Sequence, residues 1–518
     1  MRFQFSLGLV LPILFIQLQL EAAVTYQTVT LSGDAAPGTA SDILLSTTIS
    51  CPPRIDSTGR VGFDSYLTGN GVNDTNNHAI WYGSPDDLHL LARTGDPAPG
   101  FDSAQFKTLG CVKFTNAGFS AFDGTAGIGT TSDEERGLWL ADVNQTTLIV
   151  RNMTEPPGFP GTVFESPRIA GISASGTVAV WSTLIPLNNA GMWAGTPGSL
   201  QLIARSDLNP SDGSDPFFLS NGRANNAGQG VLKGVLGSTG GIWLKSDAGV
   251  ELVALKGNQA PQLPSGVVFS NFTAPRISDD GTVAFSAGLG GEAITTANGA
   301  AIWAGYPGAL NLLARKGSQA PDTSPGTLIT GVLNPPTLNR EGVVAFTAMM
   351  EGGDFAPGDM GLWMGTPSAP KLVVDTATPV ITTPDGDLEL QFFISDPAMN
   401  GRGDVAFFAV LEGPRVTANN RRSLWVRGHD GALLLIARDG DRFDVGGGDV
   451  RTIQNLHYFQ DGTDPTIGDS YFNDAGQLAF ELTFTDGSTG LFIAIVPEPV
   501  FLSLLLPLGC FLSRSRRR

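Results

Sequence analysis

A short polar turn recurs eight times along the chain. Each copy ends in a glycine, and these are Gly59, Gly118, Gly176, Gly228, Gly281, Gly342, Gly403 and Gly476. Three positions earlier stands a side chain with an oxygen atom, namely Asp56, Thr115, Ser173, Asn225, Ser278, Asn339, Asn400 and Asn473. A type I turn favours this pattern, because the oxygen caps a backbone N–H and glycine suits the fourth position. The motif therefore predicts eight tight hairpins.

The segment after each turn has the composition of a buried strand. Val283-Ala284-Phe285 is typical, since it places a large apolar residue on one face and a small one on the other. Strands of this kind belong to sheets that are covered on both sides. The next expected strand carries a large aromatic residue at one repeat position, and these are Trp81, Trp139, Trp193, Trp243, Trp303, Trp363, Trp425 and Phe492. A ring at every repeat predicts a packing wedge between neighbouring sheets.

The repeats together predict an all-β fold, a single β-propeller over residues 24–496. Each repeat supplies four strands, which fits the blade of a propeller. The eighth copy stops at Phe492–Val496 without a last strand, whereas Thr28–Gly38 resembles a last strand and its turn. These complementary ends predict eight blades closed by the N-terminal strand, so that no long edge is exposed. A seven-bladed ring and an open β repeat array are the alternatives.

The first 23 residues have the pattern of a secretory signal peptide. Arg2 gives the positive start, Phe5–Leu20 is mostly apolar, and Ala22 and Ala23 offer a small-residue cleavage site. The sequence therefore predicts export, followed by removal of residues 1–23.

The C-terminal residues 497–518 have three parts in a fixed order. Pro497, Glu498 and Pro499 precede the apolar stretch Val500–Leu512, and four arginines follow between positions 514 and 518. The stretch is short for a permanent anchor, because crossing the hydrocarbon core usually takes about 20 residues. This tail resembles the PEP-CTERM sorting signal of bacterial envelope and extracellular-matrix proteins. The resemblance implies an exosortase-type processing protease as partner, transient anchoring in the inner membrane by the tail alone, and delivery to the cell surface or matrix.

The repeats carry a second resemblance. The pattern Asn/Ser-x-x-Gly-x-Val-Ala-Phe, as in Ser278–Phe285, resembles the NxxGxxAF-type tandem repeats of bacterial surface proteins. That family has no assigned activity, so the resemblance carries no functional residue onto this chain.

The charge of the chain restricts its partners. The net charge is −18, which argues against nucleic acid, because phosphate binding depends on clustered Lys and Arg. No cofactor is predicted, although the acidic loops Ser132–Glu135 and Asp461–Asp464 could hold Ca²⁺ through oxygen ligands. Solvated turns are the simpler interpretation, since neither loop has the twelve-residue calcium spacing. The four histidines follow no catalytic or metal spacing, so we interpret them as solvated or capping and predict no catalytic residue and no metal ligand.

Four cationic residues occupy one repeat position, two residues before the turn oxygen. They are Arg54, Lys113, Arg223 and Arg276, and the other four copies have Gly171, Thr337, Ala398 and Tyr471. On the strand expected nearest the axis, these side chains would form a basic collar for a carboxylate, a sulfate or a uronic acid. The alternative is that each cation pairs locally with an acidic turn residue.

Cys51 and Cys111 stand at nearly equivalent places in adjacent repeats, eight and seven residues before the turn glycine. Export makes a disulfide between them chemically feasible. Free thiols remain the alternative, because cysteines in neighbouring blades can lie beyond the roughly 7 Å Cα separation that a disulfide tolerates.

These features favour an exported surface or matrix protein, more a binding or structural propeller than an enzyme. The expected partner is an extracellular polysaccharide or another envelope component. The alternative is a polysaccharide hydrolase or lyase on the same scaffold, which would place acids or a histidine where other repeats have neutral residues.

Overall fold

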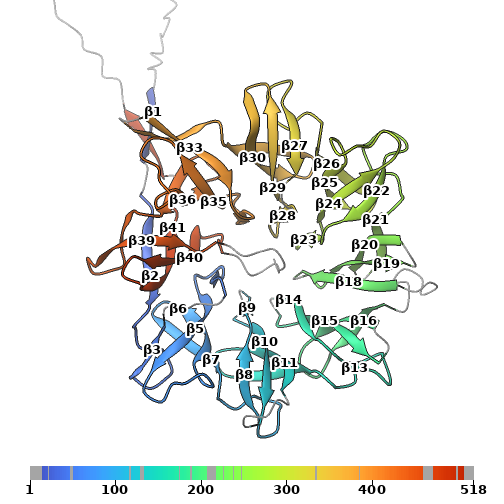
Figure 1. Ribbon diagram of the computed structural model, residues 1–518, viewed down its shortest axis with the longest axis vertical. Coiled ribbons are helices and arrows are strands. Elements are labelled where there is room, and N and C mark those ends of the chain that lie inside the picture. The colour runs from blue at the N-terminus through green and yellow to red at the C-terminus, as the bar shows by residue number, and fades with distance from the viewer. Residues whose placement is uncertain are drawn as a thin grey trace, which may run out of the picture.

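The computed structural model describes residues 14–20, 23–46, 51–115, 118–128, 134–173, 175–186, 189–206, 217–225, 227–236, 239–246, 248–332, 335–383, 386–458, 471–497 and 500–506. All the secondary-structure elements assigned in these ranges are β-strands. Eight sheets follow one another in chain order around a common centre and form a closed ring (Figure 1). The fold is an eight-bladed β-propeller, which confirms the prediction from the repeats.

The second, third and fourth strands of the blades are regular. The second strands are β5 (Val61–Gly69), β10 (Ser120–Gly127), β15 (Val178–Ile185), β19 (Gly230–Leu236), β24 (Val283–Gly290), β29 (Val344–Gly352), β35 (Val405–Glu412) and β40 (Gln477–Phe484). The third strands are β6 (His78–Ser84), β11 (Glu135–Ala141), β16 (Asn189–Gly195), β20 (Thr239–Ser246), β25 (Ala300–Tyr306), β30 (Phe355–Thr366), β36 (Arg422–Arg427) and β41 (Thr489–Ile495). The fourth strands are β7 (Asp87–Arg93), β12 (Thr146–Arg151), β17 (Gln201–Arg205), β21 (Gly249–Leu255), β26 (Ala309–Arg315), β31 (Ala369–Asp375), β37 (Leu433–Arg438) and β2 (Thr25–Leu31).

The first strand is split into two segments in six blades. The earlier segments are β3 (Ile43–Leu45), β8 (Gln105–Leu109), β13 (Val163–Phe164), β22 (Val268–Phe272), β27 (Leu328–Val332) and β33 (Gly386–Phe393). The later segments are β4 (Arg54–Ile55), β9 (Lys113–Phe114), β14 (Arg168–Ile172), β23 (Arg276–Ile277), β28 (Thr337–Leu338) and β34 (Ala398–Met399). Both segments pair with the second strand, and β9, β14, β23 and β28 lie nearest the centre of the ring (Figure 1). In blades 4 and 8 the first strand is a single segment, β18 (Phe217–Ala224) or β39 (Val450–Leu456). One further strand is added to the edge of blade 7 and one to the edge of blade 8, namely β32 (Pro379–Thr383) and β38 (Arg442–Asp444).

The N-terminal strand closes the ring. β2 pairs antiparallel with β41 of blade 8, from Thr25 opposite Ile495 to Leu31 opposite Gly490. The Tyr26 hydroxyl also donates a hydrogen bond to the carbonyl of Ile436 in blade 7, at 2.8 Å. The first and last segments of the fold therefore share one sheet, as the complementary ends predict.

The repeated turn has the predicted geometry in all eight blades. The glycine N–H donates to the carbonyl of the residue three positions earlier, at 2.9 to 3.3 Å, and each of the eight glycines has a positive φ between 76° and 89°. Where the first turn residue is asparagine, its amide makes a second contact that the sequence motif does not reveal. The Nδ2 groups donate to the first turn carbonyl of the next blade, in the pairs Asn225 to Ser278, Asn339 to Asn400, Asn400 to Asn473 and Asn473 to Asp56. The last of these bonds joins blade 8 to blade 1.

Each pair of neighbouring blades shares an apolar core. At the closure, Ala479 and Ile493 of blade 8 pack with Phe63 and Trp81 of blade 1. The seven repeat tryptophans are at most 2% exposed, which confirms the predicted wedge. Five of them donate Nε1–H to a proline carbonyl in the turn that leads into the blade, in the pairs Trp81–Pro37, Trp139–Pro99, Trp193–Pro157, Trp303–Pro261 and Trp363–Pro321.

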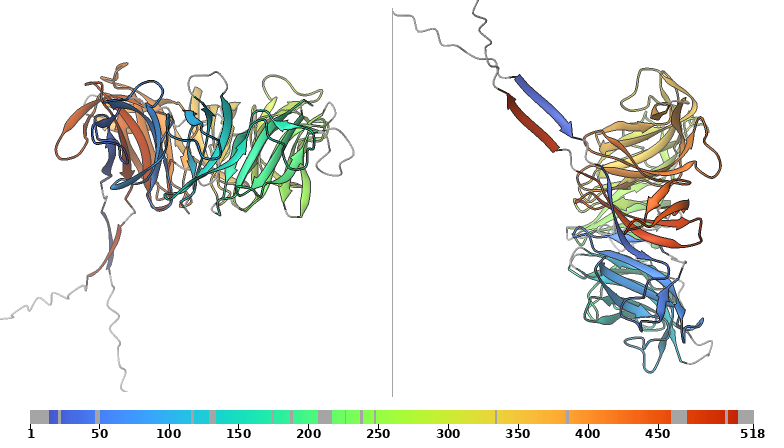
Figure 2. Two further views of the ribbon diagram at one scale, coloured as in Figure 1. Left: turned by 90° about the horizontal axis from the view of Figure 1, so that it is seen from below. Right: turned by 90° about the vertical axis from the view of Figure 1, so that its left-hand side faces the viewer.

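Two strands lie outside the ring. β1 (Leu14–Leu20) and β42 (Val500–Leu506) pair antiparallel as a ribbon that projects from the disc (Figure 2). They fall within the predicted signal peptide and the predicted sorting tail. Among the described residues, no helix is long and apolar enough to cross a membrane.

Candidate functional site

One face of each blade carries a short column of side chains whose chemistry varies from copy to copy. In blade 5, Arg276 is directly opposite Ala284, and Ser286 follows two residues later. Paired residues in adjacent strands, and residues two apart in one strand, lie on the same face of a sheet. The collar position and the residue after the repeat phenylalanine therefore share a face. We call the latter positions the second-strand layer, and they are Asp64, Asp123, Trp181, Lys233, Ser286, Thr347, Phe408 and Glu481.

The structure brings the predicted collar residues toward the centre and gives them neighbours there. The Arg54 guanidinium stacks 4.2 Å from the ring centroid of Tyr471, which holds the same repeat position in blade 8. Lys113 Nζ donates to the carbonyl of Ile169 in blade 3, at 3.4 Å. Both cations remain partly exposed. They are the two collar residues that a ligand could reach.

The other two collar residues are sealed. Arg223 and Arg276 are 7% and 5% exposed. Arg276 Nη2 lies 3.9 Å from Asp396 Oδ2, a carboxylate of blade 7 with only 14% of its side chain exposed. A polymer cannot reach guanidinium groups buried in this way, and Arg276 meets a carboxylate of blade 7 rather than an acidic residue of its own turn.

A buried histidine–carboxylate pair lies in blade 1, and sequence reasoning missed it. His78 Nε2 is 2.7 Å from Asp64 Oδ2, and Asp64 Oδ1 accepts a hydrogen bond from the backbone N–H of Cys51 at 2.9 Å. The Tyr66 ring stacks on the His78 imidazole at 4.7 Å. Asp64 is 0% exposed and His78 is 7% exposed. The interpretation of every histidine as solvated or capping was therefore wrong for His78.

A second pair lies in blade 8, on the other side of the ring closure. His457 Nδ1 is 3.7 Å from Glu481 Oε2, and His457 Nε2 is 2.8 Å from Thr483 Oγ1. Burial raises the pKa of Glu481 to about 8, and the negative charge of Asp64 adds to the effect. Burial lowers the pKa of His457, with a further contribution from Arg422. At neutral pH, Glu481 therefore holds its proton and His457 is uncharged.

The two pairs contain the groups of acid–base chemistry, but they are closed to a large substrate. A hydrolase or lyase needs its carboxylates at the sugar, within hydrogen-bond reach of the reacting atoms. Asp64 and Glu481 are 0% and 4% exposed. Neither carboxyl group is therefore open to a polysaccharide chain. Asp64 and Glu481 share one repeat position, and blades 5 and 6 have the neutral residues Ser286 and Thr347 there. This difference between copies is the sequence signal that could have revealed the two acids.

Cys51 and Cys111 form a disulfide between blades 1 and 2, with their Cα atoms 5.5 Å apart. The backbone N–H of Cys51 also donates a hydrogen bond to the carboxylate of Asp64. The crosslink therefore holds in place the residue whose backbone N–H bonds to Asp64.

Removing the disulfide is expected to cost about 4 kcal/mol of unfolding free energy, because the crosslink closes a loop of 60 residues in the unfolded chain. Chemical denaturation of the purified Cys51→Ser/Cys111→Ser double variant measures this loss. The reduced wild-type protein is the matched control and should unfold with the variant. Equal stabilities of oxidised wild type and double variant would show that the crosslink contributes nothing.

Several predicted features lie outside the described residues. Glu498 and Pro499 of the sorting motif are among them, whereas Pro497, which directly follows blade 8, is described. The same holds for residues 132–133 and 461–464 of the two acidic loops. Among the described residues, no group of three or more His, Cys, Asp or Glu side chains could hold a metal ion.

The sequence matches the model of one protein family. A family model described as "Family of unknown function (DUF7453)" matches residues 17–152 and 112–502. The chain belongs to the DUF7453 family. The two matches together include all eight blades, so the family covers the whole propeller. No curated protein sequence matches this DUF7453 chain.

Solved propellers resemble the DUF7453 chain only distantly. A puromycin hydrolase mutant complexed with PGG is 12% identical, with a TM-score of 0.38, over 85% of this chain and 59% of the hydrolase. The Dos1 propeller is 10% identical, with a TM-score of 0.38, over 89% of this chain and 94% of Dos1. The β-propeller domain of the Trilobed protease from Pyrococcus furiosus is 11% identical, with a TM-score of 0.36, over 79% and 99%. The chain spans about three fifths of the length of the hydrolase, and similarity this low supports no inference about activity.

Proposed function

We propose that this DUF7453 protein is an exported surface or matrix protein whose propeller binds an anionic glycan without turning it over. The observation that carries the proposal is the pair Arg54 and Lys113. They hold equivalent positions in neighbouring blades, remain partly exposed beside the centre of the ring, and belong to a protein of net charge −18. Cationic groups held in such a site favour carboxylates and sulfates. The sealed positions of Asp64 and Glu481 support binding over hydrolysis or lysis.

The proposal includes the processing of both ends. The signal-like residues 1–23 direct export, and an exosortase-type protease removes the tail near Pro497. The pairing of β1 with β42 outside the ring supports this division, because neither strand belongs to a blade. Intact mass of the protein recovered from the envelope tests it, and a mass that includes residues 500–518 would rule the processing out.

Binding of the purified protein to an immobilised uronate polysaccharide tests the function. The Arg54→Glu/Lys113→Glu double variant is expected to bind at least about tenfold more weakly, because reversed charges repel the carboxylates. The Lys256→Glu/Lys316→Glu double variant makes the same charge change beyond the fourth strands β21 and β26 and should bind normally.

Two outcomes would contradict the proposal. Absence of saturable binding by the wild-type protein removes the binding function. Release of new sugar ends from the polysaccharide would instead identify the protein as an enzyme.

A further inference from the structure

We propose that the pocket between blades 6 and 7 binds a single anionic sugar residue, a uronic acid or a sulfated pyranose. This inference rests on the proposed function for the choice of a glycan as ligand. It concerns a different place from the centre of the ring. The pocket has a volume of about 390 Å³, within the range of small-ligand sites of roughly 300–1,000 Å³.

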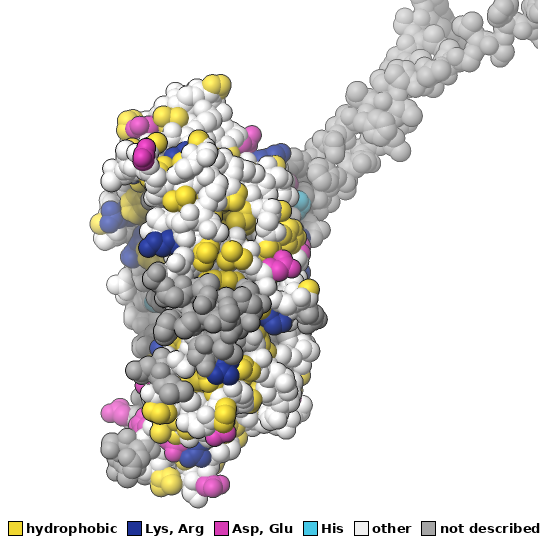
Figure 3. All heavy atoms as spheres, turned by 90° about the vertical axis from the view of Figure 1, so that its right-hand side faces the viewer, with side chains coloured by type: hydrophobic (Ala, Val, Ile, Leu, Met, Phe, Trp, Pro, Cys, Tyr) yellow, Lys and Arg dark blue, Asp and Glu magenta, His cyan; other side chains and the backbone are white. Residues whose placement is uncertain are grey.

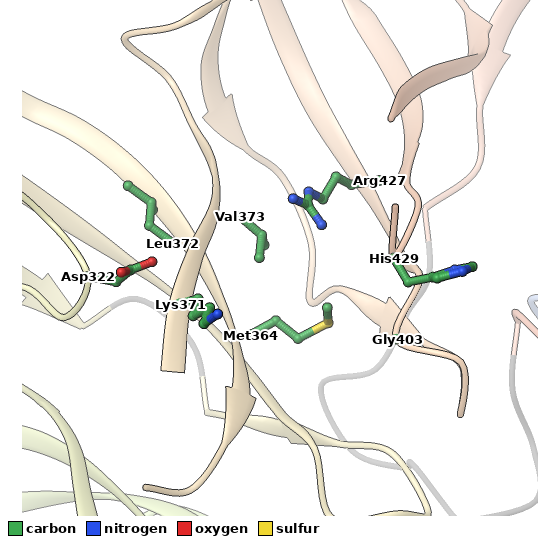
Figure 4. A pocket seen from close by; sticks show the side chains of 8 residues that line it. All are labelled: Asp322, Met364, Lys371, Leu372, Val373, Gly403, Arg427 and His429. Carbon is green, nitrogen blue, oxygen red and sulfur yellow. The ribbon is translucent and has the colours of Figure 1, made fainter. Parts of the chain in front are cut away.

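The pocket combines an apolar wall with charged groups from separate strands. Met364, Leu372 and Val373 of blade 6 form the wall, with Lys371 beside them, and Arg427 comes from β36 of blade 7. Figure 4 shows Asp322 and Lys371 on one side and the Arg427 guanidinium on the other, directed toward the space between them. A pyranose offers the matching surfaces, because its C–H face can lie on the apolar wall while an acidic substituent reaches the cations.

The combination of two cations in the pocket is specific to blades 6 and 7. Lys371 is opposite Met364, and the equivalent fourth-strand residues in other blades are His89, Thr147, Gln201, Glu251, Asn311 and Leu434. Arg427 stands two residues after the repeat tryptophan, where the other tryptophan-bearing blades have Gly83, Ala141, Gly195, Lys245, Gly305 and Gly365. Among these blade pairs, only blades 6 and 7 place a cation at both positions, so the pairing of Lys371 with Arg427 is not part of the repeated architecture.

Asp322 adds an acidic group to the pocket. It follows Pro321 with a φ of 55°, in the left-handed region, at the position that Gly38, Gly100 and Gly158 occupy in equivalent turns and that Gln262 occupies with a φ of 63° in the turn before blade 5. Non-glycine residues held in this region are concentrated at functional sites. The Asp322 carboxylate lines the pocket and can accept hydrogen bonds from sugar hydroxyls.

The cations are available to a ligand. Within the described part of the chain, Lys371 makes no ion pair or side-chain hydrogen bond, and Arg427 donates from Nη1 to the carbonyl of Gly428 at 3.1 Å. Lys371 is exposed and Arg427 is half-buried. His429 contributes little, because its Nδ1 is bound to Asp404 at 2.7 Å and its ring is turned away from the pocket (Figure 4).

A second pocket, at a different place between two other blades, carries acidic instead of basic residues. A pocket of about 270 Å³ between blades 4 and 5 is lined by turn and hairpin residues that include Gln229, Asp279 and Asp280. Its charged residues are the carboxylates Asp279 and Asp280, whereas the pocket of blades 6 and 7 has the cations Lys371 and Arg427. The side of the disc seen in Figure 3 likewise mixes basic and acidic side chains without a broad patch of one sign. The basic pocket is therefore a local feature.

Isothermal titration of the full protein with a uronate trisaccharide and with a sulfated trisaccharide tests the inference. We expect the wild type to bind at least one of the two and not a neutral trisaccharide. Lys371→Ala and Arg427→Ala should each weaken binding about tenfold, since each removes a charge-assisted hydrogen bond. Lys256→Ala, an exposed lysine of blade 4, should change nothing.

The outcomes separate this inference from the proposed function. If Lys371→Ala/Arg427→Ala binds the trisaccharide like the wild type while Arg54→Glu/Lys113→Glu does not, the pocket inference fails and the proposed function stands. If only the pocket variants lose binding, the pocket is the site and the central pair is not. If the wild type binds neither anionic trisaccharide, the pocket inference is overturned, and the polysaccharide experiment alone decides the proposed function.

Discussion

A protein that lacks β2 is expected to lose its cooperative unfolding transition and to self-associate. The deletion removes the ladder with β41, the burial of Val29 and Thr30, and the Tyr26 bond to blade 7. These losses amount to roughly 5 kcal/mol or more, which is comparable with the whole stability of many domains. The uncovered edge of β41 would then offer unpaired N–H and C=O groups to other chains.

Circular dichroism during heating and size-exclusion chromatography measure the two effects. Val29→Asp is a milder version, since it places a charge at a site that is 8% exposed. Thr25→Asp is the matched control, because Thr25 is exposed in the same strand. A synthetic peptide of residues 24–34 should restore the transition of the truncated protein. An unchanged transition after the deletion would mean that blades 8 and 1 hold together without the N-terminal strand.

Replacing Glu481 by glutamine is expected to stabilise the protein at alkaline pH. Burial raises the pKa of Glu481 from 4.5 to about 8, so the folded state binds a proton that the unfolded state releases above pH 4.5. Stability from this group is complete below pH 4.5 and is lost as the pH rises toward 8. The loss is at most about 5 kcal/mol, at ~1.4 kcal/mol per pKa unit. Glutamine keeps the shape of the protonated group and has no proton to lose.

Urea denaturation between pH 4.5 and 9 measures the difference between Glu481→Gln and the wild type. We expect the difference to be small at pH 4.5, to grow with pH and to level off above pH 8. Asp64→Asn should reduce the slope without removing it, because burial is the larger cause of the raised pKa. Glu251→Gln, at an exposed glutamate, is the control. Parallel stability curves for Glu481→Gln and the wild type would show that Glu481 is ionised in the folded protein at neutral pH.

The asparagine turns show how far local reasoning reaches. The oxygen of Asn473 caps its own turn, at 2.9 Å from the N–H of Gln477, and this role follows from the position of Gly476 three residues later. The amide of the same side chain donates to the carbonyl of Asp56, 417 residues away. The first role depends on neighbouring residues and can be predicted, whereas the second depends on how two blades meet.

The candidate site shows the same limit. Arg54, Lys113, Arg223 and Arg276 share a repeat position, so their common approach to the centre could be predicted from the sequence. Their exposure could not, because it depends on groups such as Asp396 that other blades bring to the centre. The pocket at Lys371 and Arg427 was likewise invisible in the sequence, since its charges come from different strands and only the packing of blades 6 and 7 makes them neighbours.

The sequence by itself favoured eight four-stranded blades over a seven-bladed ring or an open array, and it predicted the repeated turn, the burial of the tryptophans and the closure by the N-terminal strand. These properties arise from short-range rules that repeat: a capped turn with a glycine, a strand with two apolar faces, and ends that complete one another. Only the tertiary structure decided which charges are sealed and which are open. It also brought Asp64 and His78 into contact and placed them near Glu481. Burial and pKa depend on the distance between groups from separate blades, and blade packing, rather than chain order, sets that distance.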